Sequence, residues 1–267
     1  MLPESRISDE VRSYALPLPL PLPLPLPSPV EGNPFAELFV SVSWEGVGKG
    51  RQGAVLTRIE DAGVPLVRTT TRYGSPAQRF RPVHERLARQ IQECAGLPIG
   101  FNNALIEAYT NAYTTMGAHS DQALDLADES FIAVFSCYRH PEADSPRKLV
   151  VEPKAPGGEK FEIPLTHNSV VLFSVAANRR LKHKIVLDTP AHSADNQWLG
   201  VTFRTSKTLV QYRDGQAHLP HGDRLTLADD EQSGEFYRLR RRENNETDFT
   251  YPPLTCTVSE SDLTPPV

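Results

Sequence analysis

The feature that most constrains the fold is a series of short apolar segments between residues 103 and 205. Each has the length of a strand, is rich in Val, Ile, Phe or Tyr, and is separated from the next by Gly, Pro, Asn or Asp. They are residues 103–109, 130–138, 148–153, 160–165, 169–175, 183–188 and 198–205. So many short strands in succession predict a mainly β domain, a sandwich or a barrel, with helices packed on its outside.

One helix is expected ahead of these strands, in the segment RPVHERLARQIQECAG, residues 81–96. Its apolar residues recur from Val83 to Cys94 at steps of four, four and three, which is the period of an amphipathic helix. Pro82 suits the first helical turn, and Gly96 suits the end.

Both ends of the chain predict less order. Leu16 to Pro27 reads LPLPLPLPLPLP; proline at every second position excludes a helix and favours a stiff, extended polyproline rod. We therefore expect residues 1–33 to be a disordered tail, or alternatively a ligand for a partner domain that binds proline-rich motifs. Residues 213–267 mix a basic cluster with a polar, proline-bearing end, which predicts a partly disordered C-terminal extension.

Composition excludes several classes of protein. The chain has 28 Lys and Arg against 33 Asp and Glu, a net charge of -5, so no global basic field indicates nucleic acid. Its three cysteines, Cys94, Cys137 and Cys256, form no CxxC pair, which favours free thiols in a reducing compartment. No apolar run is long enough to cross a bilayer. We expect a soluble protein of the cytoplasm or nucleus.

A candidate metal site lies in TTMGAHSDQALDL, residues 114–126. On an extended segment, His119 and Asp121 point to the same side, because strand side chains alternate with a period of two. The preferred third ligand is His183, at the start of a predicted strand; the alternative is His192, in a polar loop. Two imidazoles and one carboxylate are the ligand set of non-haem Fe(II) oxygenases, which leaves positions open for a cosubstrate and O2. A polar turn without a metal is the alternative.

A candidate cosubstrate anchor lies on the last predicted strand, in WLGVTFRTSKT. Arginine binds carboxylates bidentately, so Arg204 would suit the second carboxylate of a 2-oxoglutarate molecule whose keto acid end chelates iron. Thr202, on the same face of the strand, would assist. The alternative for Arg204 is an ordinary surface ion pair.

The order of these parts resembles the AlkB family of iron- and 2-oxoglutarate-dependent dioxygenases. The resemblance covers about residues 65 to 212, and H-x-D, the distal histidine and T-x-R are its more specific elements. Further matching parts are the turn Arg72-Tyr73-Gly74, the helix that begins at Pro82, the pair Phe101-Asn102, Tyr109 ten residues before His119, and the segments NSVVLFSV and GVTFR.

The resemblance implies a double-stranded β-helix, or jelly roll, with flanking helices in residues 34–212. It implies Fe(II) bound by His119, Asp121 and His183, and 2-oxoglutarate contacted by Tyr109 and Arg204. The implied reaction uses O2 and converts 2-oxoglutarate to succinate and CO2 while a C–H bond is hydroxylated. In AlkB-like demethylases the hydroxylated N-methyl group leaves as formaldehyde, so an alkylated base in single-stranded DNA or RNA is the leading substrate class.

The chain departs from the family pattern at four positions. An expected asparagine is Glu107, the pattern R-x-N-x-T-x-R has Trp198 and Gly200 in place of its first arginine and asparagine, and the acidic residue that often follows H-x-D is Ala123, with the nearest carboxylate at Asp125. These departures leave two other hypotheses open. The same chemistry would act on a protein side chain or a small molecule, or the chain would be a catalytically silent β-barrel binding module.

A local basic stretch precedes the predicted helix, in the region that resembles the substrate lid of the family. It would suit nucleic acid, and its alternative is a solvated loop. A second basic run, residues 238–242, predicts the end of a short helix. The residues of the first stretch are Arg68, Arg72, Tyr73, Arg79, Phe80 and Arg81.

Overall fold

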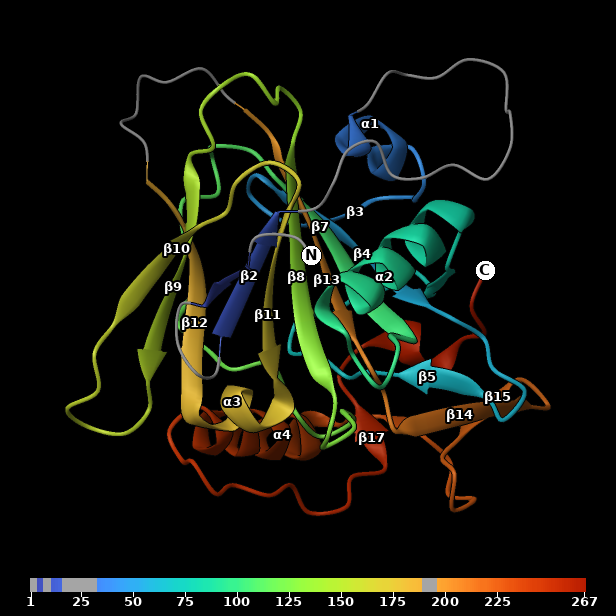
Figure 1. Cartoon of the computed structure of the whole chain (residues 1–267). Coiled ribbons are helices and arrows are strands. Elements are labelled where there is room, and N and C mark those ends of the chain that lie inside the picture. The colour runs from blue at the N-terminus through green and yellow to red at the C-terminus, as the bar shows by residue number, and fades with distance from the viewer. Residues whose placement is uncertain (1–3, 7–10, 16–32, 189–195) are drawn as a thin grey trace, which may run out of the picture.

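The computed structural model describes residues 4–6, 11–15, 33–188 and 196–267. Its largest element is a mainly antiparallel sheet in the order β1-β2-β11-β8-β13-β7-β4-β3, with β6 parallel to β4 (Figure 1). The strands are β1 (Glu4–Arg6), β2 (Val11–Ala15), β3 (Glu45–Gly48), β4 (Arg51–Thr57), β6 (Gln78–Arg79), β7 (Asn103–Tyr109), β8 (Phe131–Tyr138), β11 (Ser169–Ser174) and β13 (Trp198–Arg204).

A second, smaller antiparallel sheet has the order β10-β9-β12. Its strands are β9 (Arg147–Pro153), β10 (Phe161–Pro164) and β12 (Leu181–Leu187). The loop after β7 runs along the free edge of β12, with bridges Thr115 to Val186 and His119 to His183. The two sheets form the sandwich of a jelly roll, and the mainly β prediction is confirmed, as are all seven predicted strands.

Helices cover the outer face of the large sheet and one end of the sandwich. In Figure 1, α1 (Pro34–Phe39) and α2 (Pro82–Ala95) lie over the large sheet, while α3 (Val175–Arg180) and α4 (Asp230–Glu243) lie side by side at one end. The predicted helix is α2; it ends at Gly96, whose φ of 61° is the left-handed conformation that glycine adopts easily.

The alternation of side chains along the strands separates two apolar layers. On β13, Leu199, Val201 and Phe203 pack with Leu87 and Ile91 of α2 on the outer side of the sheet. The opposite face of the same strand points toward the small sheet, where the second apolar layer lies. One face of the large sheet therefore packs against the helices, and the other face is available for a site between the sheets.

The two ends of the chain contain more structure than predicted. Residues 11–15 form β2, which pairs with the edge strand β11, and Val11 is buried between the sheets. The edge of β11 has backbone groups that need partners, and β2 supplies them. The Leu-Pro segment lies outside the described residues.

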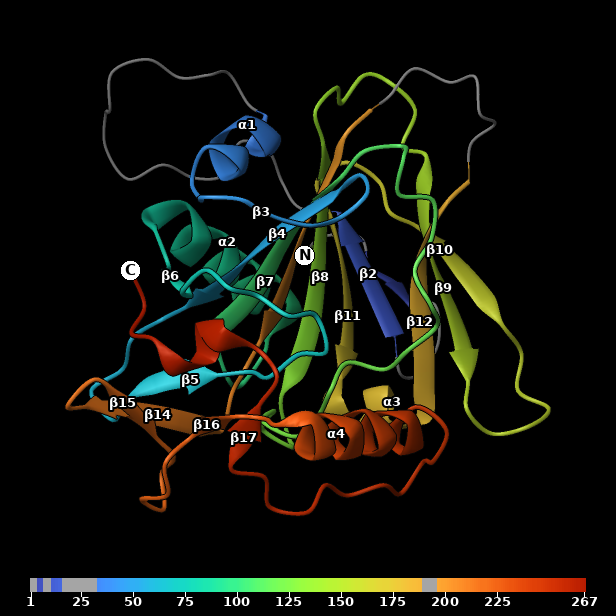
Figure 2. The ribbon, with the colours of Figure 1, turned by 180° about the vertical axis from the view of Figure 1, so that it is seen from behind.

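The C-terminal residues 213–267 are also not the frayed extension that we expected. They continue β14 (Thr208–Arg213), which pairs with β5 (Val64–Leu66), and they form further elements beside the sandwich (Figure 2). These elements are β15 (Gln216–His218), β16 (Thr226–Leu227), α4, β17 (Cys256–Thr257) and the 3-10 helix η1 (Glu260–Leu263). The polar composition misled the prediction because this segment is held in part by hydrogen bonds to residues far away in the sequence, such as Glu243 to Ala123 and Ser259 to Thr71.

Two smaller expectations can be compared with the structure. All three cysteines are free thiols, and Cys137 and Cys256 are buried. Among the helices of the described residues, none combines the length and apolar character that crossing a membrane requires.

Candidate metal centre and its pocket

The two histidines of the candidate site are brought together by backbone pairing. The amide N–H of His119 donates to the carbonyl of His183 at 3.0 Å, and the amide N–H of His183 donates to the carbonyl of His119 at 2.7 Å. Directly opposite residues of an antiparallel pair project from the same face, so the imidazole rings lie 4.8 Å apart between centroids. The preference for His183 agrees with this geometry, whereas His192 lies outside the described residues.

Asp121 is held by the short helix α3 rather than by a strand. The side-chain amide of Asn178 accepts from the Asp121 N–H at 2.8 Å and donates to the Asp121 carbonyl at 2.7 Å. Both backbone groups of Asp121 are therefore satisfied by one buried side chain, which leaves the carboxylate to the site. This residue could not be recognised from local sequence patterns.

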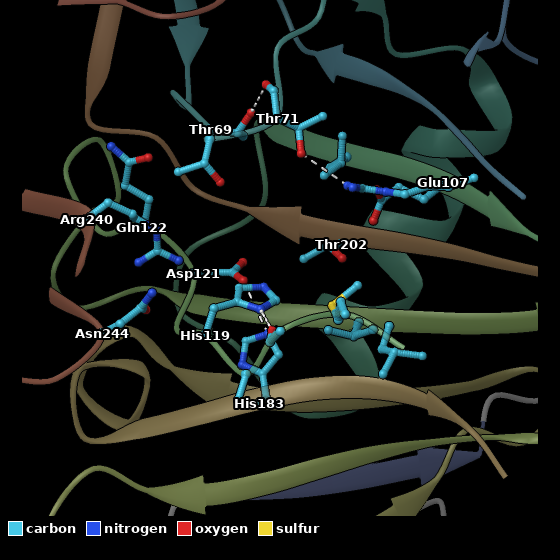
Figure 3. A pocket seen from close by; sticks show the side chains of 18 of the residues that line it. Thr69, Thr71, Glu107, His119, Asp121, Gln122, His183, Thr202, Arg240 and Asn244 are labelled. Carbon is cyan, nitrogen blue, oxygen red and sulfur yellow. Dashed lines mark hydrogen bonds and ion pairs between the residues drawn. The ribbon is translucent and has the colours of Figure 1, made fainter. Parts of the chain in front are cut away.

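The three side chains form a compact donor set. Ligand atoms of His119, Asp121 and His183 all lie within 4.8 Å of one another, and His183 Nε2 is 3.4 Å from Asp121 Oδ1. His119 Nδ1 is 2.8 Å from the Gly117 carbonyl; an N–H there leaves Nε2 with a free lone pair, the arrangement that orients a metal-binding histidine. Figure 3 shows the three side chains converging on one point of the cavity.

Electrostatics keep His119 and Asp121 in the protonation states that a metal needs. Burial, together with neighbouring His183, lowers the pKa of His119 to about 4, so its imidazole is neutral at pH 7. Burial would raise the pKa of Asp121, but the charges of Arg204 and His183 hold that pKa well below its usual value. Asp121 is therefore a carboxylate, and it is 6 % exposed.

Arg204 contacts the candidate metal ligand itself. Its Nε donates to Asp121 Oδ2 at 2.6 Å, and its side chain is only 9 % exposed. The alternative of a surface ion pair is thus excluded, because the ion pair is buried. Arg204 therefore lines the cavity at the end where the candidate metal ligands lie.

Helix α4 clamps the turn that carries His119 and Asp121. Asn244 Oδ1 accepts from the Ser120 N–H at 3.0 Å, and Glu243 Oε1 accepts from the Ala123 N–H at 2.8 Å. The Arg240 guanidinium donates to the Ser120 carbonyl and forms an ion pair with Glu243 at 2.5 Å. Because the turn has few backbone partners, these side chains from α4 provide the hydrogen bonds that a strand would otherwise provide.

A cavity of about 570 Å³ opens over the triad and extends to both sides of it. In Figure 3, Gln122, Arg240 and Asn244 lie on one side of His119 and Asp121, and Thr71 and Glu107 lie on the other. A cavity of this size holds a small ligand together with part of a second one.

The far side of the cavity contains a second ion pair. Glu107 Oε1 accepts from Arg51 Nε at 2.8 Å and from Nη2 at 2.5 Å, and Nη2 also donates to Thr71 Oγ1 at 3.2 Å. The guanidinium carbon of Arg51 lies 5.8 Å from the centre of the Tyr113 ring. Sequence patterns did not point to Arg51 or Tyr113, because neither belongs to a recognisable motif.

Tyr109 and Thr202, both predicted to contact 2-oxoglutarate, have different positions. Thr202 borders the cavity and lies between Glu107 and Asp121 (Figure 3). Tyr109 is fully buried and is not among the residues that line the cavity; its hydroxyl donates to Glu107 Oε2 at 2.7 Å. Tyr109 is therefore connected to the cavity through Glu107.

Trp198 and Gly200, the two residues of β13 that depart from the family pattern, depend on each other in the packing. The Trp198 ring folds over Gly200, so that a Cβ atom at position 200 would lie 2.0 Å from Trp198 Cη2. The ring is 1 % exposed and packs on Tyr109 with 4.8 Å between ring centres. Asparagine at position 200 is incompatible with tryptophan at position 198 in this packing.

The basic stretch before α2 is only partly available to a ligand. Arg68 is 4 % exposed and binds Asp125 through two hydrogen bonds of 2.8 and 3.0 Å, and Tyr73 is also buried. The pair explains the role of Asp125, which is the carboxylate nearest to the missing acidic position: it fixes the segment under α4 and β17. Arg72, Arg79 and Arg81 are exposed.

Comparison with known proteins finds matches among solved structures at low identity. No protein-family model matches the sequence, and no curated protein matches it. A solved structure described as OsALKBH1 aligns with 76 % of this chain and 100 % of its own, at 12 % identity and a TM-score of 0.49. An oxidoreductase of the 2OG-Fe(II) oxygenase family from Burkholderia pseudomallei aligns with 64 % of this chain and 76 % of its own, at 16 % identity and a TM-score of 0.40. The roles of individual residues rest on the geometry above.

Proposed function

We propose that this protein is an Fe(II)- and 2-oxoglutarate-dependent dioxygenase whose iron is held by His119, Asp121 and His183. The observation that carries the proposal is the convergence of two imidazoles and one carboxylate at the wall of a cavity between two sheets. Two nitrogen donors and one oxygen donor leave half of an octahedral coordination shell for small molecules. A structural zinc site would more often be closed by a fourth protein ligand.

The residues present fit this cofactor. His119 has one ring nitrogen fixed by the Gly117 carbonyl, which leaves the other for the metal, and Asp121 is an oriented carboxylate. When bound, iron with 2-oxoglutarate and O2 supplies an oxidant for C–H bonds, with succinate and CO2 as products. The chain would hold the ion, orient its carboxylate ligand through Arg204 and enclose the site between the sheets.

For the substrate, we propose an alkylated nucleic acid base, demethylated with release of formaldehyde. The support is the cavity beside the triad, together with the exposed cations Arg72, Arg79 and Arg81 on the preceding segment. A single-stranded or flipped base would need a pocket of this kind and positive charge for its phosphates. Partners on this proposal are O2, 2-oxoglutarate and single-stranded DNA or RNA.

A second candidate is the same chemistry on a protein side chain or a small molecule. The observation that favours it is the buried pair Arg68–Asp125, which removes one cation from the predicted nucleic acid surface, in a chain of net charge -5.

Product analysis separates the two candidates. The Fe(II)-loaded protein is incubated with 2-oxoglutarate, oxygen and N-methylated single-stranded oligonucleotides at several salt concentrations. Formaldehyde and succinate in equal amounts, with binding that weakens as salt rises, support the nucleic acid substrate. If succinate forms but no tested oligonucleotide yields formaldehyde, the result would point to a protein side chain or a small molecule as the substrate.

Metal binding tests the ligand assignment separately from turnover. Alanine at His119, Asp121 or His183 is expected to abolish binding of one Fe(II) per chain under anaerobic conditions, whereas alanine at His192 is expected to leave it unchanged. Loss of binding in the His192 variant together with retention in the His183 variant would overturn the proposed triad.

A further inference from the structure

The end of β13 away from Arg204 has no cation, although the family pattern R-x-N-x-T-x-R begins there with an arginine. Trp198 occupies that position, and its ring covers Gly200. A dicarboxylate bound by iron through its keto acid end still has a second carboxylate to place, and a buried carboxylate needs a charged partner. Another residue that faces the cavity must provide it.

Strand register places Arg51 in the same row as Trp198. Arg51 lies opposite Tyr109, and Tyr109 lies opposite Trp198. Directly opposite residues project from the same face of a sheet, so Arg51 faces the space between the sheets, two strands away from the residue that lacks a charge. Arg51 lines the same cavity as the triad.

The contacts of Arg51 preorganise its guanidinium without using all of it. Glu107 and Thr71 bind Nε and Nη2, and Nη1 is used by neither. The Arg51 side chain is 17 % exposed, more than those of the other arginines that line the cavity, although each of these, like Arg51, has a carboxylate partner. Those side chains are Arg68 at 4 %, Arg204 at 9 % and Arg240 at 9 %.

The spacing between the two ends suits a short dicarboxylate. Glu107, which binds the Arg51 guanidinium, lies opposite Gly200, and Arg204 at the metal end is four residues further along β13. Thr202 lies between them and borders the cavity. Alternate residues of a strand are about 7 Å apart, so positions 200 and 204 are separated by about 14 Å. A five-carbon dicarboxylate and one arginine side chain together span a distance of this size.

We propose that Arg51 binds the distal carboxylate of the 2-oxoglutarate cosubstrate, with Glu107 holding the guanidinium in place. The inference rests on the proposed function, because it assigns a residue to the cosubstrate of the same site. It also explains a departure that is otherwise unfavourable: the carboxylate of Glu107 faces the cosubstrate region as the partner of a cation and not as an isolated negative charge.

The experiment measures ligand binding without turnover. Anaerobic, Mn(II)-loaded protein is titrated by calorimetry with 2-oxoglutarate and with 2-oxopentanoate, which has the same keto acid end and no distal carboxylate. Wild type is expected to prefer 2-oxoglutarate by about tenfold to hundredfold, the size of a charge-assisted arginine contact. Arg51→Gln is expected to lose this preference while its affinity for 2-oxopentanoate stays unchanged, and Arg51→Lys, which keeps the charge, is expected to retain part of it.

Glu107→Gln separates a binding role of Arg51 from a structural one. Removing the negative charge frees Arg51 for the ligand, so 2-oxoglutarate is expected to bind as tightly as to wild type or more tightly. Arg89→Gln, at an exposed arginine of α2, is the control and is expected to bind like wild type.

Three results would overturn the inference: an unchanged preference in Arg51→Gln, an equal loss of both ligands in that variant, or the same loss in Glu107→Gln. Wild type that binds neither Mn(II) nor either keto acid would instead contradict the proposed function itself, and the inference would fall with it.

Discussion

The packing of Trp198 over Gly200 predicts a strong coupling between these two positions. In Gly200→Ala the new Cβ would lie 2.0 Å from Trp198 Cη2 and 2.4 Å from Cζ2. The ring has little room to move, since it is 1 % exposed and packs on Tyr109. Overpacking of this kind costs about 1–3 kcal/mol, so we expect the free energy of unfolding to fall by about 2 kcal/mol.

The same substitution should be harmless once the ring is removed. In a Trp198→Leu background the clash is absent, and alanine is favoured over glycine within a strand by about 0.5–1 kcal/mol. The two single changes and the double change, measured by urea unfolding of the metal-free protein, form a double-mutant cycle. We expect a coupling free energy of about 2–4 kcal/mol, the sum of the two effects.

Additivity of the two substitutions would refute this reasoning. A neutral Gly200→Ala in the wild-type background would refute it as well, since it would mean that the ring does not occupy the space above position 200. The expected result has a consequence for the site: restoring asparagine at position 200 requires a simultaneous change at Trp198.

Three further substitutions test other parts of the site. Asp121→Ala leaves the buried Arg204 without its partner, which costs about 3–5 kcal/mol; thermal unfolding of metal-free protein checks this, and an unchanged melting temperature would contradict it. Asn244→Ala removes the acceptor for the Ser120 N–H, and it should weaken Fe(II) affinity about tenfold in an anaerobic titration while circular dichroism stays unchanged; wild-type affinity would exclude a role of α4 in ordering the turn. Burial, with a nearby negative charge, raises the pKa of Asp262 from 3.8 to about 7. Between these values the folded state binds more protons than the unfolded state, so wild-type stability falls as pH rises from about 4 to about 7. Asp262→Asn should lack this fall and gain up to a few kcal/mol over wild type above pH 7; parallel stability profiles in denaturant would contradict it.

Local patterns predicted the strands, and they pointed to three side chains that the structure brings together. The seven strands could be recognised because each is a short run of residues suited to a pleated surface, bounded by turn residues. His119 and Asp121 could be paired because a period of two puts them on one side of an extended segment. His183 could be preferred because it begins such a run, and β12 indeed aligns it with His119.

The environment of the ligands could not be predicted, because it depends on contacts between distant residues. Asn178 binds Asp121 across 57 positions, and Asn244 binds Ser120 across 124. Nothing in the polar sequence of α4 indicates that it holds the turn of the candidate metal site. For the same reason the C-terminal segment was mistaken for a frayed end.

Other features of the pocket depend on strand register. Arg51 belongs to no motif, and it enters the cavity only because β4 pairs with β7 so that Arg51 lies opposite Tyr109. The relation between Trp198 and Gly200 is different: a large ring two residues from a glycine on one face of a strand is a local signal, and it could have been interpreted as packing rather than as the loss of two pocket residues.

The most direct test of the central claim is oxygen-dependent release of succinate. The protein is reconstituted anaerobically with Fe(II) and 2-oxoglutarate, oxygen is admitted, and succinate is measured for wild type, for His119→Ala and for His221→Ala, an exposed histidine that serves as control. We expect succinate from wild type and the control, and none above background from His119→Ala. Folded, iron-loaded wild type that releases no succinate, or equal release from His119→Ala, would contradict the proposed dioxygenase activity.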